Sequence, residues 1–139
     1  MKRFIIILVS ALALVSCEDQ VSRVSGTYAY KISGNVTLGE NERSLPVEEG
    51  SMEVIRLSAD SALLTFNVLR GGVYTTYAKI EEKEIVLEPY TRSLTIGLKE
   101  YTVMASGEGT IYDGTIVIDL NYDSADVLGE DITLLCKKN

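Results

Sequence analysis

From Gly26 to the C-terminus, the chain is a succession of short runs in which apolar and polar residues alternate, separated by Gly, Asp, Asn and Ser. Because successive side chains of a β-strand point to opposite faces, this period of two predicts strands that bury one face and expose the other. No window shows a helical period of useful length. The sequence therefore predicts an all-β fold, with strands over residues 26–33, 35–38, 51–57, 61–69, 72–81, 84–90, 99–106, 109–113, 114–122 and 131–137.

Turn signals between these runs predict antiparallel hairpins. Asp113-Gly114 separates two of the runs, and Asp and Gly tolerate the positive φ angles that a two-residue hairpin turn requires. Gly71-Gly72 predicts a similar turn, whereas the charged segment 39–50 is predicted to be a loop. The hairpins follow one another in sequence, which indicates a meander of neighbouring strands.

A sheet of about eight strands with one buried face has two stable solutions, a closed barrel or an open β-sandwich. Sequential hairpins favour the single antiparallel up-and-down β-barrel, which also leaves no exposed edges. The interior of an eight-stranded barrel is just wide enough either to be filled by side chains or to hold one small ligand. We predict the barrel, with the sandwich as the alternative.

Two segments resemble a known class of barrels. Ser25-Gly26-Thr27-Tyr28 at the first strand resembles the Gly-x-Trp opening of the lipocalin-like (calycin) barrels. Residues 106–118, SGEGTIYDGTIVI, are similar to the Gly-rich hairpin of calycin-like lipoproteins of Bacteroidota. The chain departs from the pattern because Tyr28 stands where the family has Trp, and the last strand offers Lys137 and Lys138 rather than an Arg to pack on that ring. The resemblance implies a calycin-like ligand-binding barrel.

The N-terminal segment reads as an export signal. Lys2 and Arg3 precede an apolar run of eleven residues, 4–14, which would span only about 16 Å as a helix and is too short for a bilayer core of about 30 Å. Leu14-Val15-Ser16-Cys17 then resembles the lipobox of bacterial lipoproteins. The resemblance implies a signal peptide at 1–16 and acylation of Cys17, and two or more acyl chains give stable membrane anchoring.

The residues after Cys17 refine the expected location. Position 18 is not Asp, the residue associated with inner-membrane retention, and the pair Glu18-Asp19 resembles a surface-export signal of Bacteroidota lipoproteins. We expect a lipid-anchored protein of the outer membrane that faces either the periplasm or the cell surface. The predicted division is a lipidated Cys with a short tether at 17–25 and a β-barrel domain at 26–139.

Composition excludes several functions. Without residues 1–16 the chain would keep 11 Lys and Arg against 20 Asp and Glu, so a nucleic acid would be repelled. The chain has no His, which removes the commonest general acid–base and the commonest transition-metal ligand. Asp119, Asn121 and Asp123 share spacing with a calcium loop, but Ser124 stands where that loop needs Gly. We therefore predict no enzyme activity, no metal and no cofactor.

Eight Tyr residues accompany the strands. Their rings would offer apolar faces and hydroxyl groups to a small amphipathic ligand at a barrel mouth, although core packing also explains them. Tyr28 and Tyr30 begin the first strand near a barrel end and are the predicted ligand-binding pair. Asp60-Ser61-Ala62 and Asp123-Ser124-Ala125 resemble the Bacteroidota O-glycosylation motif, so Ser61 and Ser124 are predicted acceptors.

Two functional hypotheses follow. The first is a membrane-anchored, non-catalytic lipoprotein whose barrel binds a small apolar or amphipathic ligand. The second is a ligand-free protein–protein interaction module, an accessory subunit or inhibitor, that presents segments such as 39–50 to another envelope protein. A lumen filled by Tyr28, Phe66, Ile116 and Leu134 would favour the second hypothesis, and an open lumen the first.

Overall fold

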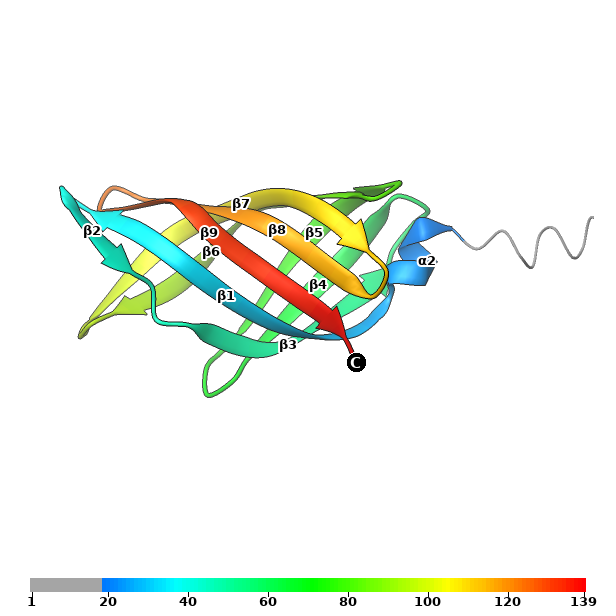
Figure 1. Cartoon of the computed structure of the whole chain (residues 1–139), viewed down its shortest axis with the longest axis horizontal. Coiled ribbons are helices and arrows are strands. Elements are labelled where there is room, and N and C mark those ends of the chain that lie inside the picture. The colour runs from blue at the N-terminus through cyan, green and yellow to red at the C-terminus, as the bar shows by residue number, and fades with distance from the viewer. Residues whose placement is uncertain (1–18) are drawn as a thin grey trace, which may run out of the picture.

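The computed structural model describes residues 19–139, which form one short helix and nine strands (Figure 1). The elements are α2 (Gln20–Val24), β1 (Gly26–Leu38), β2 (Asn41–Ser44), β3 (Glu48–Arg56), β4 (Ser61–Val68), β5 (Val73–Glu81), β6 (Glu84–Ile96), β7 (Lys99–Tyr112), β8 (Thr115–Asp123) and β9 (Val127–Lys138). No helix among these residues is long and apolar enough to cross a membrane.

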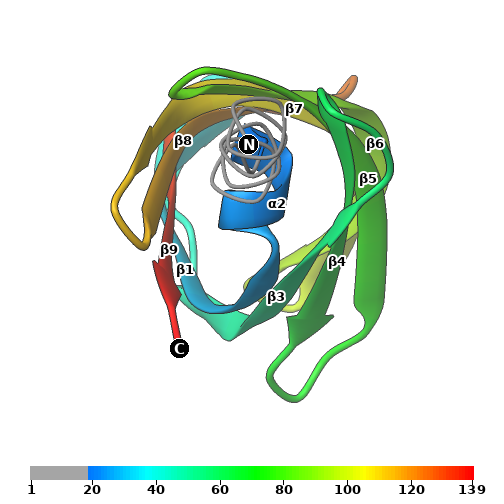
Figure 2. The ribbon, with the colours of Figure 1, turned by 90° about the vertical axis from the view of Figure 1, so that its right-hand side faces the viewer.

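The nine strands form one antiparallel sheet that closes on itself. Strands β3 to β9 follow one another as neighbours, and β1 lies between β3 and β9. The pairing of β1 with β9 runs from Tyr28 opposite Lys138 to Leu38 opposite Val127, and it closes an eight-stranded barrel (Figure 2). The short strand β2 pairs with the far end of β1 as an additional strand. This confirms the predicted up-and-down barrel, and the chain does not adopt the open sandwich.

Several strands are longer than the sequence predicts. The runs 26–33 and 35–38 are one strand, β1, which continues through Gly34 at a φ of 151°, a conformation that other residues rarely adopt. The runs 99–106 and 109–113 are likewise one strand, β7. The prediction of a loop over 39–50 is wrong in part, since β2 and the start of β3 lie in it and pair with β1. The turn at Asp113-Gly114 is confirmed, with Gly114 at a φ of 69°.

Inward-facing side chains fill the half of the barrel nearest α2. The predicted alternation of β8 is confirmed, because Ile116, Ile118 and Leu120 are fully buried. The four residues chosen to distinguish a filled lumen from an open one, Tyr28, Phe66, Ile116 and Leu134, are each at most 2% exposed. The lumen is therefore filled at these four positions, which is the outcome expected of the interaction module.

Helix α2 lies across one end of the barrel (Figure 2). Asp19 caps it by accepting a hydrogen bond from the Ser22 N–H at 2.8 Å, and the Asp19 carboxylate also pairs with Arg56 of β3 at 2.7 Å. These contacts hold the pKa of Asp19 well below its usual range. Val21 and Val24 are buried against the core. Residues 20–24, expected to belong to a tether, are thus part of the barrel domain.

Tyr28 of the first strand and Lys138 of the last strand both contact α2 at the closed end. The Tyr28 hydroxyl donates to the Val24 carbonyl at 2.6 Å. Lys138 Nζ lies 5.9 Å from the centroid of the Tyr28 ring and donates to the Arg23 carbonyl at 3.0 Å. A Lys of the last strand therefore contacts both the aromatic ring of the first strand and the backbone of α2.

Strands β7 and β8 approach closely at Gly109. A Cβ atom at this position would overlap the Val117 carbonyl oxygen and lie 2.6 Å from Ile118 Cα, and both are backbone atoms that cannot move aside. We expect Gly109→Ala to lower the free energy of unfolding by about 2 kcal/mol or more, in the range of overpacked cores. Urea unfolding followed by far-UV circular dichroism measures this loss.

Gly72 provides the matched control for this substitution. No atom lies within 4 Å of the position that a Cβ would take there. Gly72→Ala is expected to change the free energy of unfolding by less than about 0.5 kcal/mol, as is usual for surface positions. Equal effects of the two substitutions would contradict the close approach of β7 and β8.

Candidate ligand-binding site

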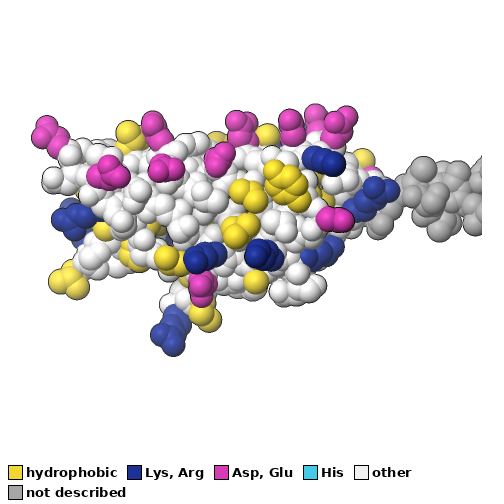
Figure 3. All heavy atoms as spheres, viewed as in Figure 1, with side chains coloured by type: hydrophobic (Ala, Val, Ile, Leu, Met, Phe, Trp, Pro, Cys, Tyr) yellow, Lys and Arg dark blue, Asp and Glu magenta, His cyan; other side chains and the backbone are white. Residues whose placement is uncertain are grey.

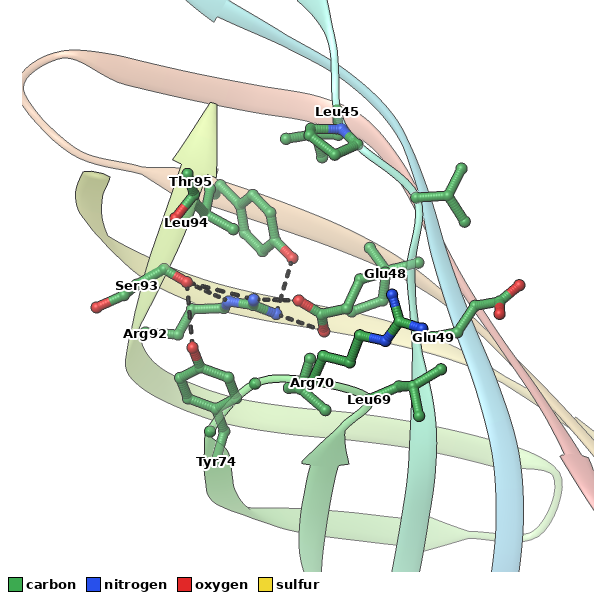
Figure 4. A pocket seen from close by; sticks show the side chains of 17 residues that line it. Leu45, Glu48, Glu49, Leu69, Arg70, Tyr74, Arg92, Ser93, Leu94 and Thr95 are labelled. Carbon is green, nitrogen blue, oxygen red and sulfur yellow. Dashed lines mark hydrogen bonds and ion pairs between the residues drawn. The ribbon is translucent and has the colours of Figure 1, made fainter. Parts of the chain in front are cut away.

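A cleft of about 460 Å³ lies at the barrel end opposite α2, which we call the mouth (Figure 4). Its walls come from β1, the segment before β3, the β4–β5 turn, β5, β6 and β8. Apolar side chains such as Ile32, Leu45 and Leu94 line it beside the charged residues Glu48 and Arg92. The cleft combines an apolar wall with a few polar groups, which is the usual composition of a small-molecule site.

A β-bulge in β6 places Arg92 inside the barrel. Leu87 pairs with Gly107, but the next aligned pair is Tyr90 with Ala105, so β6 carries one extra residue at Glu88-Pro89. Both of these residues point outward, and the alternation resumes one position later. Pro89 suits a bulge because it has no N–H to contribute to a ladder. If the alternation ran unbroken from Leu87, which points inward, Arg92 would face solvent.

The bulge also marks where β5 and β6 separate. Their ladder runs only from Glu81 opposite Glu84 to Ala78 opposite Leu87. Towards the mouth, side chains replace the ladder, because Thr76 Oγ1 donates to the Glu88 carbonyl at 2.8 Å and the Tyr74 hydroxyl to the Ser93 carbonyl at 3.3 Å. Side chains rather than a backbone ladder therefore join β5 to β6 beside the cleft.

Arg92 is the charged residue buried most deeply among residues 19–139, with 5% of its surface exposed. Its Nη1 donates to Glu48 Oε2 at 3.1 Å, and its Nη2 donates to Glu48 Oε1 in a short bond. Nη1 also lies 3.4 Å from the Tyr122 hydroxyl, and Nε donates to the Ser93 carbonyl at 3.3 Å. The guanidinium lies 4.6 Å from the Tyr74 ring centroid, within cation–π range.

Glu48 reaches this arginine from the solvent side of the cleft. It is the first residue of β3, after residues 45–47, which have no regular structure, and its side chain is 17% exposed. Its Oε2 also accepts a hydrogen bond from the Tyr30 hydroxyl at 3.0 Å. Three donors from two strands therefore converge on one carboxylate.

The environment fixes the protonation of this cluster. Burial lowers the pKa of Arg92, but the hydrogen bonds and charge of Glu48 outweigh it and hold that pKa above its usual value. Burial raises the pKa of Tyr30 and of Tyr122 above the usual range, and raises the pKa of Tyr90 to about 12. The cluster therefore holds a charged arginine and neutral tyrosines at neutral pH.

The predicted ligand-binding tyrosines lie at different depths. Tyr30 is buried and contacts Glu48 beneath the cleft, and its ring packs edge-on against Phe66 at 5.3 Å. Tyr28 is buried at the closed end, beneath α2. The structure thus brings Tyr30, but not Tyr28, to the mouth. The ligand-binding role of both stays a prediction.

The other predicted sites lie away from the cleft or outside the described residues. Ser61 begins β4 with its Oγ 2.6 Å from Ser58 Oγ, and Ser124 Oγ accepts the Val127 N–H in the β8–β9 turn at 3.0 Å. Both are half-buried, and their glycosylation stays a prediction. The signal peptide at 1–16 and the lipidation site Cys17 lie outside residues 19–139.

Acidic side chains gather along one edge of the outer surface (Figure 3). On this surface Glu108 of β7 lies directly opposite Asp119 of β8, a pairing of like charges that water must screen. Within the described part of the chain, no group of three or more His, Cys, Asp or Glu residues is arranged to hold a metal ion. These carboxylates form a solvated face.

Sequence reasoning missed the central residue of the cleft. Arg92 lies two residues after the predicted strand 84–90, in the segment Tyr90-Thr-Arg-Ser-Leu-Thr-Ile96. In that segment Arg92 is in phase with Tyr90, Leu94 and Ile96, all of which are buried. After Pro89, apolar residues again occupy every second position apart from that of Arg92, but in a phase shifted by one residue. This shift was the available signal that the arginine points inward.

No protein-family model and no curated protein sequence matches the chain. Among solved structures, EF1p2_mFAP2b bound to DFHBI matches with a TM-score of 0.55 and 10% identity over 85% of this chain and 95% of that one. A redesigned β-barrel matches with a TM-score of 0.53 and 9% identity, over 88% and 99%. These similarities show a shared β-barrel fold.

A Bacteroides fragilis protein, provisionally described as an outer membrane protein, matches with a TM-score of 0.49 and 18% identity. That match covers 86% of this chain and 52% of the other.

The buried tyrosines predict a loss of stability at alkaline pH. Tyr90 keeps its proton to about pH 12 in the folded state, whereas an unfolded tyrosine loses it near pH 10. Between these values the folded chain binds more protons, so the free energy of unfolding falls as pH rises, by about 1.4 kcal/mol per pH unit for each such group. Urea titrations at a series of pH values between these limits measure the slope.

Two variants test the origin of that slope. Tyr90→Phe removes one titrating group and is expected to make the slope shallower. Tyr112 is 59% exposed, and Tyr112→Phe should leave the slope unchanged. A stability that does not change between about pH 10 and pH 12 would contradict the burial of neutral tyrosines in the folded barrel.

Proposed function

We propose that the protein is a calycin-like lipoprotein of the outer membrane that binds a small amphipathic ligand at the barrel mouth, without catalysis. The observation that carries the proposal is the cleft itself, an apolar-walled cavity of about 460 Å³ with a buried arginine at its floor. A protein with the same fold, EF1p2_mFAP2b, is bound to DFHBI, which supports a ligand in a barrel of this kind.

The ligand belongs at the mouth because the opposite half is filled. Tyr28, Ile116 and Leu134 are fully buried in the core near α2. The polar groups available to orient a ligand, those of Arg92 and Glu48, lie beneath the cleft. A ligand with an apolar body and a polar end would place the body against the Ile32 and Leu94 side of the cleft.

Lipidation at Cys17 would fix the direction in which the mouth faces. Asp19 lies at the closed end, where it caps α2 and pairs with Arg56. Two residues extend over at most about 7 Å, so an anchor at Cys17 would hold the α2 end against the membrane. The mouth would then face away from the bilayer and exchange its ligand with the aqueous side.

The second candidate is an interaction module, and exposed apolar side chains at the mouth favour it. Leu69 in the β4–β5 turn is 65% exposed and Leu98 in the β6–β7 turn is fully exposed. Such side chains would suit contacts with another envelope protein. A barrel that takes up no ligand would favour this function.

Ligand binding is tested by placing a charge at the rim of the cleft. Leu69 lines the cleft, so a bound ligand that covers this position would desolvate the carboxylate introduced by Leu69→Glu. This variant should bind an amphiphile from a cell extract at least about tenfold more weakly than the wild type. Leu98→Glu adds the same charge at the same end of the barrel, away from the residues that line the cleft, and should leave binding unchanged. Native mass spectrometry of the purified protein after incubation with the extract reads the adduct directly. A protein that emerges without any adduct would argue against the proposal.

The anchor is tested with the chain's two cysteines. Cys17→Ala should abolish incorporation of radiolabelled palmitate and release the protein from the membrane fraction. Cys136 is fully buried on the inner face of β9, and burial raises the pKa of its thiol to about 12, so it is no substrate for acylation. Cys136→Ala should keep the label. Label retained by Cys17→Ala would contradict the lipobox interpretation.

A further inference from the structure

We propose that Arg92 and Tyr30 form a receptor for the carboxylate of an anionic amphiphile, and that Glu48 occupies this receptor in the structure described here. The inference rests on the proposed function and names the chemical class of the ligand. Binding would exchange one carboxylate for another, with the side chain of Glu48 moving out into solvent as the head group moves in.

The donor set is that of a carboxylate site. Arg92 presents two nitrogen atoms to the two oxygens of Glu48, the forked geometry in which guanidinium recognises carboxylates. The Tyr30 hydroxyl adds a third donor to the Oε2 atom at 3.0 Å. None of these donors is specific for a glutamate, because they contact only its two oxygens.

The receptor keeps its shape without Glu48. The Arg92 side chain is held from the other side by the Ser93 carbonyl, which accepts from Nε and from Nη2 at 3.3 Å each. The rings of Tyr74 and Tyr122 lie 4.6 and 5.7 Å from the guanidinium carbon. Because Arg92 is fixed in this way and only 5% exposed, another anion must take the place of Glu48 when the Glu48 side chain moves out. A neutral or cationic head group would leave the charge of Arg92 uncompensated.

Glu48 is the partner that can leave. Its side chain is 17% exposed, against 4% for that of Arg92, so a rotation towards the cleft opening would return its carboxylate to water. The preceding residues 45–47 have no regular structure, and Val47 is 56% exposed. The arginine, by contrast, lies in the middle of β6, which pairs with β7 along this stretch.

The cleft provides for the rest of the ligand. Ile32, Leu45 and Leu94 line it and are each at most 8% exposed, so they form an apolar wall beside the receptor. Arg70 in the β4–β5 turn also lines the cleft and extends beside Glu48 and Glu49 in Figure 4. An aliphatic chain along the wall and a carboxylate on Arg92 would satisfy both parts of the site.

The test compares three probes that share an eight-carbon chain and differ in head group. Octanoate, octan-1-ol and octyltrimethylammonium are titrated into the full chain by isothermal titration calorimetry. The wild-type protein should bind octanoate at least about tenfold more tightly than octan-1-ol, and the cation most weakly. Equal affinities for octanoate and octan-1-ol would overturn the inference and leave the proposed function standing. Binding of none of the probes, by the wild type or by Glu48→Gln, would count against both.

Variants identify the receptor. Glu48→Gln keeps the hydrogen-bond acceptor but removes the competing charge, so octanoate should bind about tenfold more tightly than to the wild type, with octan-1-ol unchanged. Glu49→Gln is the matched control, because Glu49 also lines the cleft but is exposed and has no hydrogen bond or ion pair with Arg92 in the described structure. Weaker octanoate binding to Glu48→Gln, or an equal gain in Glu49→Gln, would contradict the exchange.

The double variant Glu48→Gln/Arg92→Gln separates recognition from folding. It removes both charges of the pair, so no buried charge is left alone. Octan-1-ol should bind as before and the tenfold preference for octanoate should disappear. A preference that persists would place the anion elsewhere. Thermal unfolding of each variant confirms that a barrel is present, and the head-group preference of the wild type decides the question should a variant fail to fold.

Discussion

The pairing of β1 with β9 is the interaction on which the rest of the structure depends. It joins the first and last strands of a sheet and converts the sheet into a barrel, so that the inner face of every barrel strand turns towards one core. The register places Tyr28 opposite Lys138, and this brings the end of the chain next to α2. Closure therefore also seals one end. The other end, where β5 and β6 separate, is left with the cleft.

The two ends of the barrel differ in what they bury. The α2 half buries aliphatic side chains and Tyr28 without any charge, whereas the mouth half also buries a charged pair among tyrosines. An ion pair in a protein interior gives a small net gain in stability, because the desolvation of both charges offsets their attraction. Stability alone would be served equally well by apolar residues at these positions. The pair is therefore better explained by a role at the cleft, and its place at the edge of solvent rather than in the packed half agrees with that.

Much of the fold could be predicted from the sequence, because it depends on a local period of two that each strand carries by itself. For example, the alternation within β8 alone places Ile116 and Ile118 on the buried face of the sheet. Helix α2 could not be predicted in this way, since its five residues show no helical period and it is held to the barrel by the ion pair of Asp19 with Arg56, a contact between residues far apart in the sequence. The start of β3 was also missed, because Glu48-Glu49-Gly50 has no apolar alternation and is a strand through its pairing with β1, which lies far away in the sequence.

The site was harder to predict than the fold for a related reason. Tyr30 could be proposed from its position in the first strand, but its partner Glu48 lies 18 residues away, and Arg92 lies 44 residues beyond that. Arg92 points inward because of one extra residue at the bulge, and a shift of one residue exchanges the two faces of a strand. The bulge thus changes the phase of the alternation, so that an arginine that an unbroken alternation from Leu87 would place on the solvated surface becomes the buried cation of the mouth. Period-two reasoning assigns faces correctly only up to the first bulge, and in this barrel the residues beyond that bulge include the cation at the floor of the cleft.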